Sequence, residues 1–487
     1  MTGSLVEIRE DGRRVTGLEG ARYEVRPGPK PLLHLWSPER SLVRRVSRVV
    51  ESANDRIRIE VERFGPKGAG RIEITRREIP RPRYRIERES FAERFALLLR
   101  QQFPDETVES ITVAPDLEHS LSGSYARGWM RHGQQAWAFL GAGPSETTST
   151  IDAALTFGLI WLDWLRTRAV APVIAGLRLV LPADTSRMTA HRLGAVEAGA
   201  PIELYEWREE EPLARRMDVA DAGNVSTWLT HRRETERILA QAAQPDAAIR
   251  ALAPSAIDSV VVPGTRQVAW RYHGLEFARW ARGKVRFGIG RKRVELDQGN
   301  WGELERLVAD LMAQRRPESN RRHPLFRAAK ERWLETVARA EITRIDARLD
   351  PDQVYCQVPA VSAADRGVID LLAATAGEGR LAVIELKADE DPQMVLQAVD
   401  YWLRVRWHLR QGDFERYGYF PGKTLQPADP LLYLVAPGLR FHSVTRTVMR
   451  YLATDIPVCQ VGLNEDWRRS FRVTERFSRP EQRAAPR

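Results

Sequence analysis

The chain has 487 residues, 43% hydrophobic and 29% charged, which is the composition of a globular protein of about three domains and excludes a disordered or fibrous chain. Its two cysteines, Cys356 and Cys459, exclude a disulfide scaffold or a cysteine-rich zinc module and favour a reducing cytoplasm. The 75 lysines and arginines exceed the 65 acidic residues by 10, which makes nucleic acid a candidate partner.

No membrane partner is expected from the sequence. The longest apolar run, ALTFGLIWLDWL, is interrupted by Asp163 and is shorter than the ~20 residues that span a bilayer. The start, MTGSLVEIRED, lacks the basic and then apolar segments of a signal peptide. A cytoplasmic protein is therefore expected.

Residues 1–88 are predicted to form a β-rich module. The segments RIRIEVERF (56–64) and GRIEITRREI (70–79) alternate apolar and charged residues with a period of two. This alternation is typical of half-buried strands.

The next two regions mix helices with strands. Residues 89–208 are predicted to contain a helix at 91–103, an apolar helix at 153–168 and a strand at 176–182. Residues 209–322 are predicted to form an accessory α+β region, with a β-meander in VAWRYHGLEFARWARGKVRFGIGRKRVEL and a final helix in WGELERLVADLMAQR.

Residues 323–475 are predicted to form an α/β domain, and residues 476–487 a disordered tail. Within the domain, VIDLLAA (368–374) and RLAVIELKA (380–388) are predicted to pair as a β-hairpin. Glu385 and Lys387 then share one face of their strand, because strand side chains alternate between faces. That face would meet Asp370 on the neighbouring strand.

This group of two carboxylates and one ammonium suits hydrolysis of a phosphodiester. Asp370 and Glu385 are the candidate ligands of a divalent ion, Mg²⁺ or Mn²⁺, which takes the substrate phosphate as a further ligand. Lys387 would position the attacking water, help to deprotonate it and offset negative charge. An E-x-K triplet is usually a solvent-facing chance occurrence, but here it lies in an apolar run, where unpaired charges are costly.

The same segment resembles the PD-(D/E)xK nuclease superfamily in its RecB-like branch, and most closely the C-terminal domain of NucS-type DNA endonucleases. The resemblance implies a restriction-endonuclease-like mixed sheet flanked by helices. It also implies that Asp370 and Glu385 bind the metal and that Lys387 is catalytic. Ile369, and not proline, precedes Asp370.

Further catalytic residues follow from this resemblance alone. Gln397 and Tyr401, in QAVDY, match the Q-x-x-x-Y motif of RecB-like members. The family carries a glutamate on the helix that opens the domain, which here is Glu331 or Glu335; Glu331 is favoured because its distance to the following segments fits better.

The N-terminal half is predicted to hold a degenerate copy of this domain at residues 89–208. AERFALLL matches KERWLETV, and WLDWLRTR matches VDYWLRVR, at a constant offset of 238 residues. ARGWM is similar to DRGVI, and GLRLVLP to LLYLVAP. Layered α/β proteins also generate similar strings by chance, so this alternative stays open.

The acids do not recur in the predicted copy. Arg131, Leu140 and Ala142 are expected at the positions of Asp370, Glu385 and Lys387, which would leave the copy without activity. Leu159 and Asp163 are expected at the positions of Gln397 and Tyr401, and Glu93 persists on the first helix. Arg131 is a candidate phosphate contact, because an arginine in place of an acid favours an anion.

Arg440, Arg446 and Arg450, near the last helix, are further candidate DNA contacts, and a solvated basic face explains them equally well.

The sequence therefore predicts a divalent-metal-dependent deoxyribonuclease, an endonuclease by resemblance. The residues themselves separate neither endo- from exonucleolytic cutting nor DNA from RNA. A non-catalytic nucleic-acid-binding or assembly protein on the same fold, and a nuclease acting on RNA, are the alternatives. No GxxxxGK[ST] motif occurs, so translocation would require a helicase or another repair or defence partner.

Overall fold

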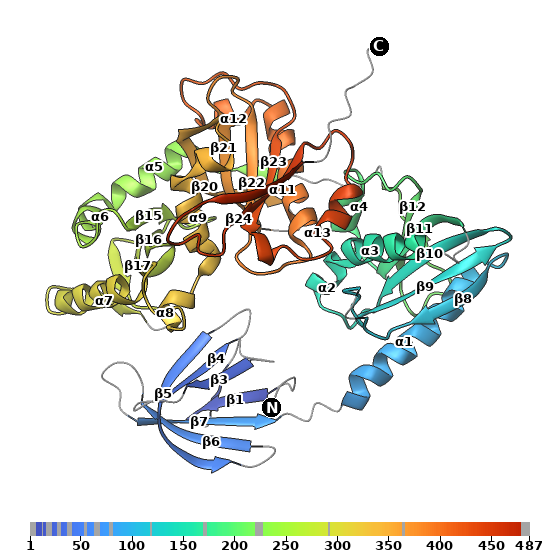
Figure 1. Cartoon of the computed structure of the whole chain (residues 1–487), viewed down its shortest axis with the longest axis horizontal. Coiled ribbons are helices and arrows are strands. Elements are labelled where there is room, and N and C mark those ends of the chain that lie inside the picture. Colours follow the sequence, from blue (N-terminus) through green and yellow to red (C-terminus); the bar gives the residue numbers. More distant parts are fainter. Residues whose placement is uncertain are drawn as a thin grey trace. The chain divides into compact units, whose positions relative to one another are not determined.

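The computed structural model describes residues 6–11, 13–15, 22–26, 31–36, 41–52, 56–62, 69–76, 81–116, 119–168, 173–219, 227–290, 293–362 and 366–478. It is a mixed α/β structure with mixed and antiparallel sheets flanked by helices (Figure 1). The chain forms two compact units: residues 1–87 with 320–328, and residues 88–319 with 329–487. The predicted boundary at 322/323 therefore falls inside a short segment, 320–328, that belongs with the N-terminal unit.

The described strands of the first unit form a seven-stranded antiparallel sheet in the order β2-β1-β7-β6-β5-β4-β3. Its apolar positions, including Leu33, Leu35, Val61 and Ile72, form one core, as the period of two predicts. The elements are β1 (Val6–Glu10), β2 (Arg13–Arg14), β3 (Arg22–Arg26), β4 (Leu32–Trp36), β5 (Ser41–Ser52), β6 (Arg56–Glu62), β7 (Ala69–Arg76) and α8 (Pro324–Arg327).

The second unit contains three sheets. The first is six-stranded, in the order β13-β12-β11-β10-β9-β8. Its strands are β8 (Thr107–Thr112), β9 (Tyr125–His132), β10 (Gln135–Ala142), β11 (Val173–Pro182), β12 (Ile202–Trp207) and β13 (Arg215–Arg216). Its helices are α1 (Arg81–Gln102), α2 (Thr148–Asp152), α3 (Ala154–Thr167) and α4 (Arg187–Leu193).

The second sheet is seven-stranded, in the order β14-β20-β21-β22-β23-β24-β25. Its strands are β14 (Thr227–Leu229), β20 (Leu349–Ser362), β21 (Arg366–Thr375), β22 (Leu381–Leu386), β23 (Leu431–Pro437), β24 (Val458–Leu463) and β25 (Val473–Ser478). The helices around it are α9 (Lys330–Ala340), α10 (Ile342–Ile345), α11 (Met394–Arg410), α12 (Asp413–Arg416) and α13 (Thr445–Arg450), with a 3-10 turn at Gly438–Arg440.

The third sheet is the predicted meander, and it is antiparallel throughout. Its strands are β15 (Ile257–Val261), β16 (Val268–Tyr272), β17 (Leu275–Ala281), β18 (Lys284–Phe287) and β19 (Val294–Glu295), and its helices α5 (Arg232–Gln241), α6 (Ala243–Arg250) and α7 (Trp301–Gln314). Residues 209–322 are nevertheless not one separate region. β13 pairs with β12 of the first sheet, and β14 pairs with β20 of the second.

The predicted tail at 476–487 also differs in part from the structure. Arg476 and Ser478 belong to β25, which pairs with β24 and so satisfies the backbone groups of that sheet edge. Residues 479–487 lie outside the described residues.

The first two sheets of the second unit have the same topology, apart from the additional edge strand β14. In each, three strands form an antiparallel meander (β8-β9-β10 and β20-β21-β22), the next two add in parallel (β11-β12 and β23-β24), and a last strand pairs antiparallel (β13 and β25). The crossovers hold helices in the same order, α3 then α4 and α11 then α13. The strand order thus agrees with the sequence match between two halves of the second unit. The first half is the sheet of β8–β13 with its helices, and the second half is the sheet of β20–β25 with its helices.

Candidate functional site

The candidate site lies where β21 and β22 separate. Leu371 pairs with Ile384 in their antiparallel ladder, so the next position sets Asp370 opposite Glu385 on the same face. All six residues of β22 are buried, because the strand lies inside its sheet between β21 and β23 and is contacted by helices α9 and α11. Glu385 and Lys387 therefore lie at the C-terminal end of β22, where its apolar run stops.

Asp370 closes the end of the hairpin with its side chain. Its Oδ2 accepts a hydrogen bond from the backbone N–H of Leu386 at 3.0 Å, and its Oδ1 lies 3.4 Å from Nη1 of Arg332. Burial raises the pKa of Asp370, and the nearby Arg332 guanidinium and the Leu386 hydrogen bond oppose that rise.

Glu385 is the most deeply buried acid of the site, with 1% of the residue exposed. Its Oε1 lies 3.0 Å from Nζ of Lys387, whereas its Oε2 has no hydrogen-bond partner among the described residues. Burial, and then the charge of Asp370, raise the pKa of Glu385 well above its usual value despite Lys387. A buried carboxylate oxygen without a partner is costly unless a cation or a proton satisfies it.

Lys387 follows β22 directly and its ammonium faces three carboxylates. Nζ lies 3.0 Å from Glu385 and 3.5 Å from Asp391. Burial acts to lower the pKa of Lys387, but Glu385, Glu331 and Asp391 outweigh it and the pKa is raised. The raised pKa favours the charged ammonium form of Lys387, which suits charge stabilisation.

Helix α9 supplies both glutamates that the sequence offered, at different depths. Glu331 reaches solvent beside Lys387 and Asp370. Desolvation by the surrounding protein, and the charge of Asp370, raise the pKa of Glu331 against the effect of Lys387. Glu335 is only 5% exposed, and its Oε2 accepts hydrogen bonds of 2.6 Å from Arg332 and from Gln357. Burial raises the pKa of Glu335 to about 8, against the pull of Arg332. Glu331 is therefore the one that borders the open site.

Gln397 and Tyr401 lie on one face of α11, as a spacing of four predicts. Nε2 of Gln397 donates to the Tyr401 hydroxyl at 3.1 Å. Burial, and then the charge of Glu385, raise the pKa of Tyr401. Helix α11 packs against β22, the strand that carries Glu385.

Three residues of the site were not predicted from the sequence: Arg332, Gln357 and Asp391. Arg332 bridges Glu335 and Asp370. Gln357 reaches Glu335 from β20 with a φ of 55°, a left-handed conformation that non-glycine residues rarely adopt. The position of Arg332 between two candidate glutamates on α9 was the one available signal.

The strand ladders correct the predicted register of the first half. Leu140 pairs with Leu179 as Glu385 pairs with Leu434, so Leu140 holds the Glu385 position. Across the antiparallel ladder, however, Leu140 faces Arg127 and not Arg131. The short ARG/DRG string match misled the alignment, because ladder hydrogen bonds, and not string similarity, set a register.

The two arginines have different surroundings. Arg127 is 3% exposed and donates to the carbonyl oxygens of Ser122 and Ala114, at 3.1 and 2.6 Å. Arg131 lies near the end of β9 and forms a 2.9 Å ion pair with Glu109. The proposed phosphate contact at Arg131 therefore does not coincide with the counterpart of the site.

The remaining counterparts carry no acid at the Glu385 and Lys387 positions, since Leu140 and Ala142 are buried apolar residues. Leu159 is buried in the core, and Glu93 is exposed on α1. Asp163 accepts hydrogen bonds from Arg450 and from the Tyr451 hydroxyl.

The other candidate DNA contacts are arginines in ion pairs. Arg440 lies 3.8 Å from Glu465, Arg446 lies 3.2 Å from Glu475, and Arg450 lies 3.0 Å from Asp163. Arg450 thus joins α13 to α3 of the first half.

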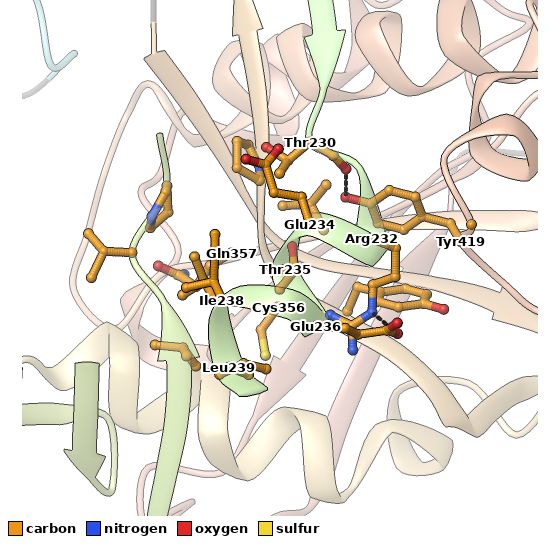
Figure 2. A pocket seen from close by; sticks show the side chains of 18 of the residues that line it. Thr230, Arg232, Glu234, Thr235, Glu236, Ile238, Leu239, Cys356, Gln357 and Tyr419 are labelled. Carbon is orange, nitrogen blue, oxygen red and sulfur yellow. Dashed lines mark hydrogen bonds and ion pairs between the residues drawn. The ribbon is translucent and has the colours of Figure 1, made fainter. Parts of the chain in front are cut away.

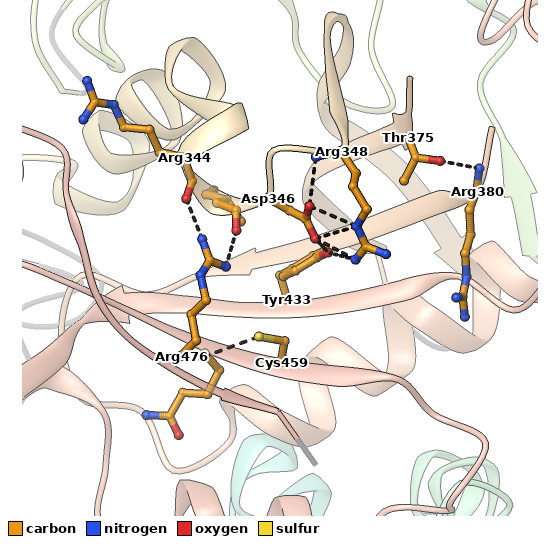
Figure 3. A network of polar contacts seen from close by, with 10 residues as sticks. Arg344, Asp346, Arg348, Thr375, Arg380, Tyr433, Cys459 and Arg476 are labelled. Atoms are coloured by element: carbon orange, nitrogen blue, oxygen red, sulfur yellow. Dashed lines mark hydrogen bonds and ion pairs between the residues drawn. The ribbon is translucent and has the colours of Figure 1, made fainter. Parts of the chain in front are cut away.

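A polar network joins residues 344–348 to strands β23 and β25 of the same sheet (Figure 3). The Tyr433 hydroxyl on β23 donates to Asp346, which is also paired with Arg348 at 2.7 Å. Burial would raise the pKa of Asp346, but the hydrogen bonds from Arg348 and Tyr433 lower it to about 2. Arg476 on β25 donates to the carbonyl oxygens of Arg344 and Ile345, so the segment after α9 is fixed to two strands.

A pocket of about 770 Å³ lies along β20 (Figure 2). α5, the edge strand β15 and the loop around Tyr419 line it together with β20. Gln357 is the residue it shares with the surroundings of Glu335. Neither Asp370 nor Glu385 lines the pocket.

The donor set at the candidate site is small. Among the described residues, no group of three or more histidine, cysteine, aspartate or glutamate side chains has the geometry to hold a metal ion. Asp370 and Glu385 are the two carboxylates available to a hard divalent ion, because Glu385 Oε2 lacks a hydrogen-bond partner among the described residues and the charge of Asp370 raises the pKa of Glu385. Such an ion commonly has one or two protein carboxylates and completes its shell with water and phosphate.

No protein-family model matches the chain, and no curated protein matches its sequence. Within the described residues, no helix has both the length and the apolar character needed to cross a membrane.

Proposed function

We propose that the chain is a divalent-metal-dependent nuclease that hydrolyses phosphodiester bonds of DNA. The observation that supports this most directly is the convergence of Asp370, Glu385 and Lys387 at the end of β22, where one buried oxygen of Glu385 has no partner. A buried carboxylate oxygen without a partner is costly, and so its presence here favours a functional role.

The residues have distinct roles in this proposal. Asp370 and Glu385 would hold Mg²⁺ or Mn²⁺, which when bound stabilises negative charge on the phosphate and lowers the pKa of a bound water. The Lys387 ammonium offsets charge on the phosphate. Glu331 borders the open side of the site, and the Gln397–Tyr401 pair positions the substrate strand.

The order of the strands also supports the proposed nuclease function. We infer that the sheet of β20–β25 belongs to a restriction-endonuclease-like domain of the RecB-like branch. The matching order of β8–β13 favours a degenerate copy of that domain in the first half. The excess of 10 basic residues over acidic ones is compatible with DNA as the partner. A cytoplasmic location and a helicase or another repair or defence protein as a further partner belong to this proposal.

The test is incubation of the purified full-length chain with circular single-stranded, linear and branched DNA, and with RNA, in Mg²⁺ or Mn²⁺. Cleavage of DNA that stops when the metal is chelated is expected. Cleavage of circular DNA would identify an endonuclease. Cleavage of RNA alone would replace the substrate, and binding without cleavage in either metal would favour the non-catalytic alternative.

Site variants make this test specific. Asp370→Ala, Glu385→Ala and Lys387→Ala should each abolish cleavage and leave DNA binding in place. The matched controls are Lys330→Ala and Asp389→Ala, which break an exposed 2.8 Å ion pair nearby and should retain cleavage. Normal cleavage by Lys387→Ala would show that the lysine is only a structural cation.

A further inference from the structure

The two similar halves of the second unit contact each other through equivalent elements. Helix α3 packs against α13, and α11 packs against α4, so each half offers the same pair of helices (Figure 1). Val196 and Leu452 form an antiparallel bridge between the halves. Val196 lies six residues before β12 and Leu452 six residues before β24, so each contacts its own counterpart.

The hydrogen bonds at this bridge are reciprocal. The backbone N–H of Glu197 donates to Tyr451, and that of Ala453 donates to Ala195, both at 2.8 Å. The counterparts of 197 and 195 are 453 and 451, so the two bonds exchange when the halves are exchanged. A surface that contacts its own equivalent in this way is the signature of a two-fold arrangement.

The contact is also firmly packed. One continuous hydrophobic core contains residues of both sheets, from Leu140 and Leu179 of the first half to Val383 and Leu434 of the second. Two ion pairs cross it: Arg192 on α4 with Asp400 on α11, and Arg450 on α13 with Asp163 on α3. The two halves therefore form one body with a fixed geometry.

The chemistry of the two halves is unequal. The second half carries Asp370, Glu385 and Lys387, whereas the described counterparts in the first half are Arg127, Leu140 and Ala142. In a two-fold dimer of active nucleases, each subunit would present one set of acids to one strand of the duplex, since protein symmetry follows that of the DNA. Here the place of the second subunit is taken by a half that lacks the counterparts of these acids.

We propose that one chain binds duplex DNA across this internal two-fold and cuts only one of the two strands. The inference rests on the proposed nuclease function. In each event one water oxygen bonds to phosphorus and one phosphorus–oxygen ester bond breaks. One water proton ends on the leaving oxygen and the other on the phosphate, which leaves a hydroxyl end and a phosphate end. The product is a nick, and no second copy of the chain is required.

The test is a time course on supercoiled plasmid with limiting full-length chain and Mg²⁺, in which supercoiled, open-circular and linear forms are separated. Open circles should accumulate until the supercoiled form is consumed, with linear DNA appearing only afterwards. Linear DNA that appears from the first time point in constant ratio to open circles would overturn the inference. Failure to cut any DNA would instead overturn the proposed function.

A second measurement excludes pairing of chains. The inactive Asp370→Ala/Glu385→Ala chain is mixed with the active chain at a fixed total concentration below plasmid saturation. If one chain suffices, the nicking rate should fall in proportion to the active fraction. A fall with the square of that fraction would show that two active chains act together and would overturn the single-chain inference.

Discussion

The guanidinium of Arg192 on α4 lies 2.7 Å from the carboxylate of Asp400 on α11, and this buried ion pair joins the two halves of the second unit. Both side chains are almost fully buried, at 8% and 4% exposed, whereas the second pair across the contact, Arg450 with Asp163, is 61% and 23% exposed. The same type of contact thus occurs once inside the protein and once at its surface.

Arg192→Ala should therefore destabilise the chain by about 3–5 kcal/mol, because it leaves Asp400 buried without its cation. Arg450→Ala is the matched control and should cost about 0–1 kcal/mol, since the exposed pair is screened by water. Denaturant unfolding of both variants measures the difference. Equal losses would mean that burial does not distinguish the two pairs.

Gly274 is expected to be required for the position of α9. It has a φ of 77°, and a Cβ there would lie 2.2 Å from the carbonyl oxygen of Arg332. Gly283, in the next hairpin, has a φ of 79° and no atom within 4 Å of such a Cβ. Both Gly→Ala changes carry about 1–2 kcal/mol of backbone strain.

Gly274→Ala should cost about 1–3 kcal/mol more than Gly283→Ala, because overpacking must displace the backbone of α9. It should also lower cleavage, since Glu331 and Arg332 lie on that segment, whereas Gly283→Ala should not. Thermal unfolding and plasmid cleavage measure the two effects. Identical behaviour of the variants would show that α9 accommodates the extra methyl group.

Metal binding should be detectable without activity. If Asp370 and Glu385 hold the ion, Mg²⁺ should raise the unfolding temperature of the wild-type chain. At a Mg²⁺ concentration 100 times the Kd, the free energy of unfolding should rise by about 2.7 kcal/mol. Glu385→Gln should abolish this gain, and Asp389→Asn should retain it. A gain that persists in Glu385→Gln would place the ion elsewhere.

The sequence predicted those parts of the site that depend on local pattern. The apolar run that ends at Glu385 and Lys387, and the period of two along β21 and β22, were sufficient to predict the hairpin and the position of Asp370. Arg332 and Gln357 were missed because their contacts come from a separate helix and from a strained position of β20. No local pattern encodes such contacts.

The first half shows the same limit. String similarity was sufficient to predict two sheets whose strand orders turn out to match, but not the register of β9 against β10, which put Arg127 where Arg131 was expected. Likewise β13 and β14 are too short for their sequences to reveal that they extend two different sheets.

His273 should make stability depend on pH. It stacks on Trp333 with ring centroids 5.3 Å apart, and burial, together with the nearby Arg315, lowers its pKa from 6.5 to about 4. The neutral ring is therefore favoured in the folded state, and stability should be lost as the pH falls from about 6.5 to about 4, by up to about 3 kcal/mol. Because its φ is 43°, asparagine is the replacement best suited to the backbone.

His273→Asn should flatten the stability profile between pH 6.5 and pH 4, even though the loss of the stacked ring lowers stability at all pH values. Urea unfolding across this range provides the slope. A variant profile as steep as that of the wild type would assign the pH dependence to other groups.

The last prediction concerns Arg127 and Arg131, which lie on the same strand of the first half. Arg127 is buried and donates to two backbone carbonyl oxygens, so Arg127→Met should cost about 2–3 kcal/mol by leaving those carbonyls without a donor. Arg131 is half exposed and paired only with Glu109 among the described residues, so Arg131→Met should change stability by no more than about 0.5 kcal/mol.

Because Arg127 is inaccessible to phosphate, its replacement should leave both the affinity for DNA and the salt dependence of that affinity unchanged in the folded variant. Arg131→Glu should weaken binding and reduce the salt slope only if the exposed end of β9 contacts DNA, since fewer counterions would then be released. Binding isotherms at several salt concentrations, with unfolding measured in parallel, separate these effects. A folded Arg127→Met chain with weakened DNA binding would show that the counterpart of the catalytic site still receives a phosphate, contrary to a purely structural role for this arginine.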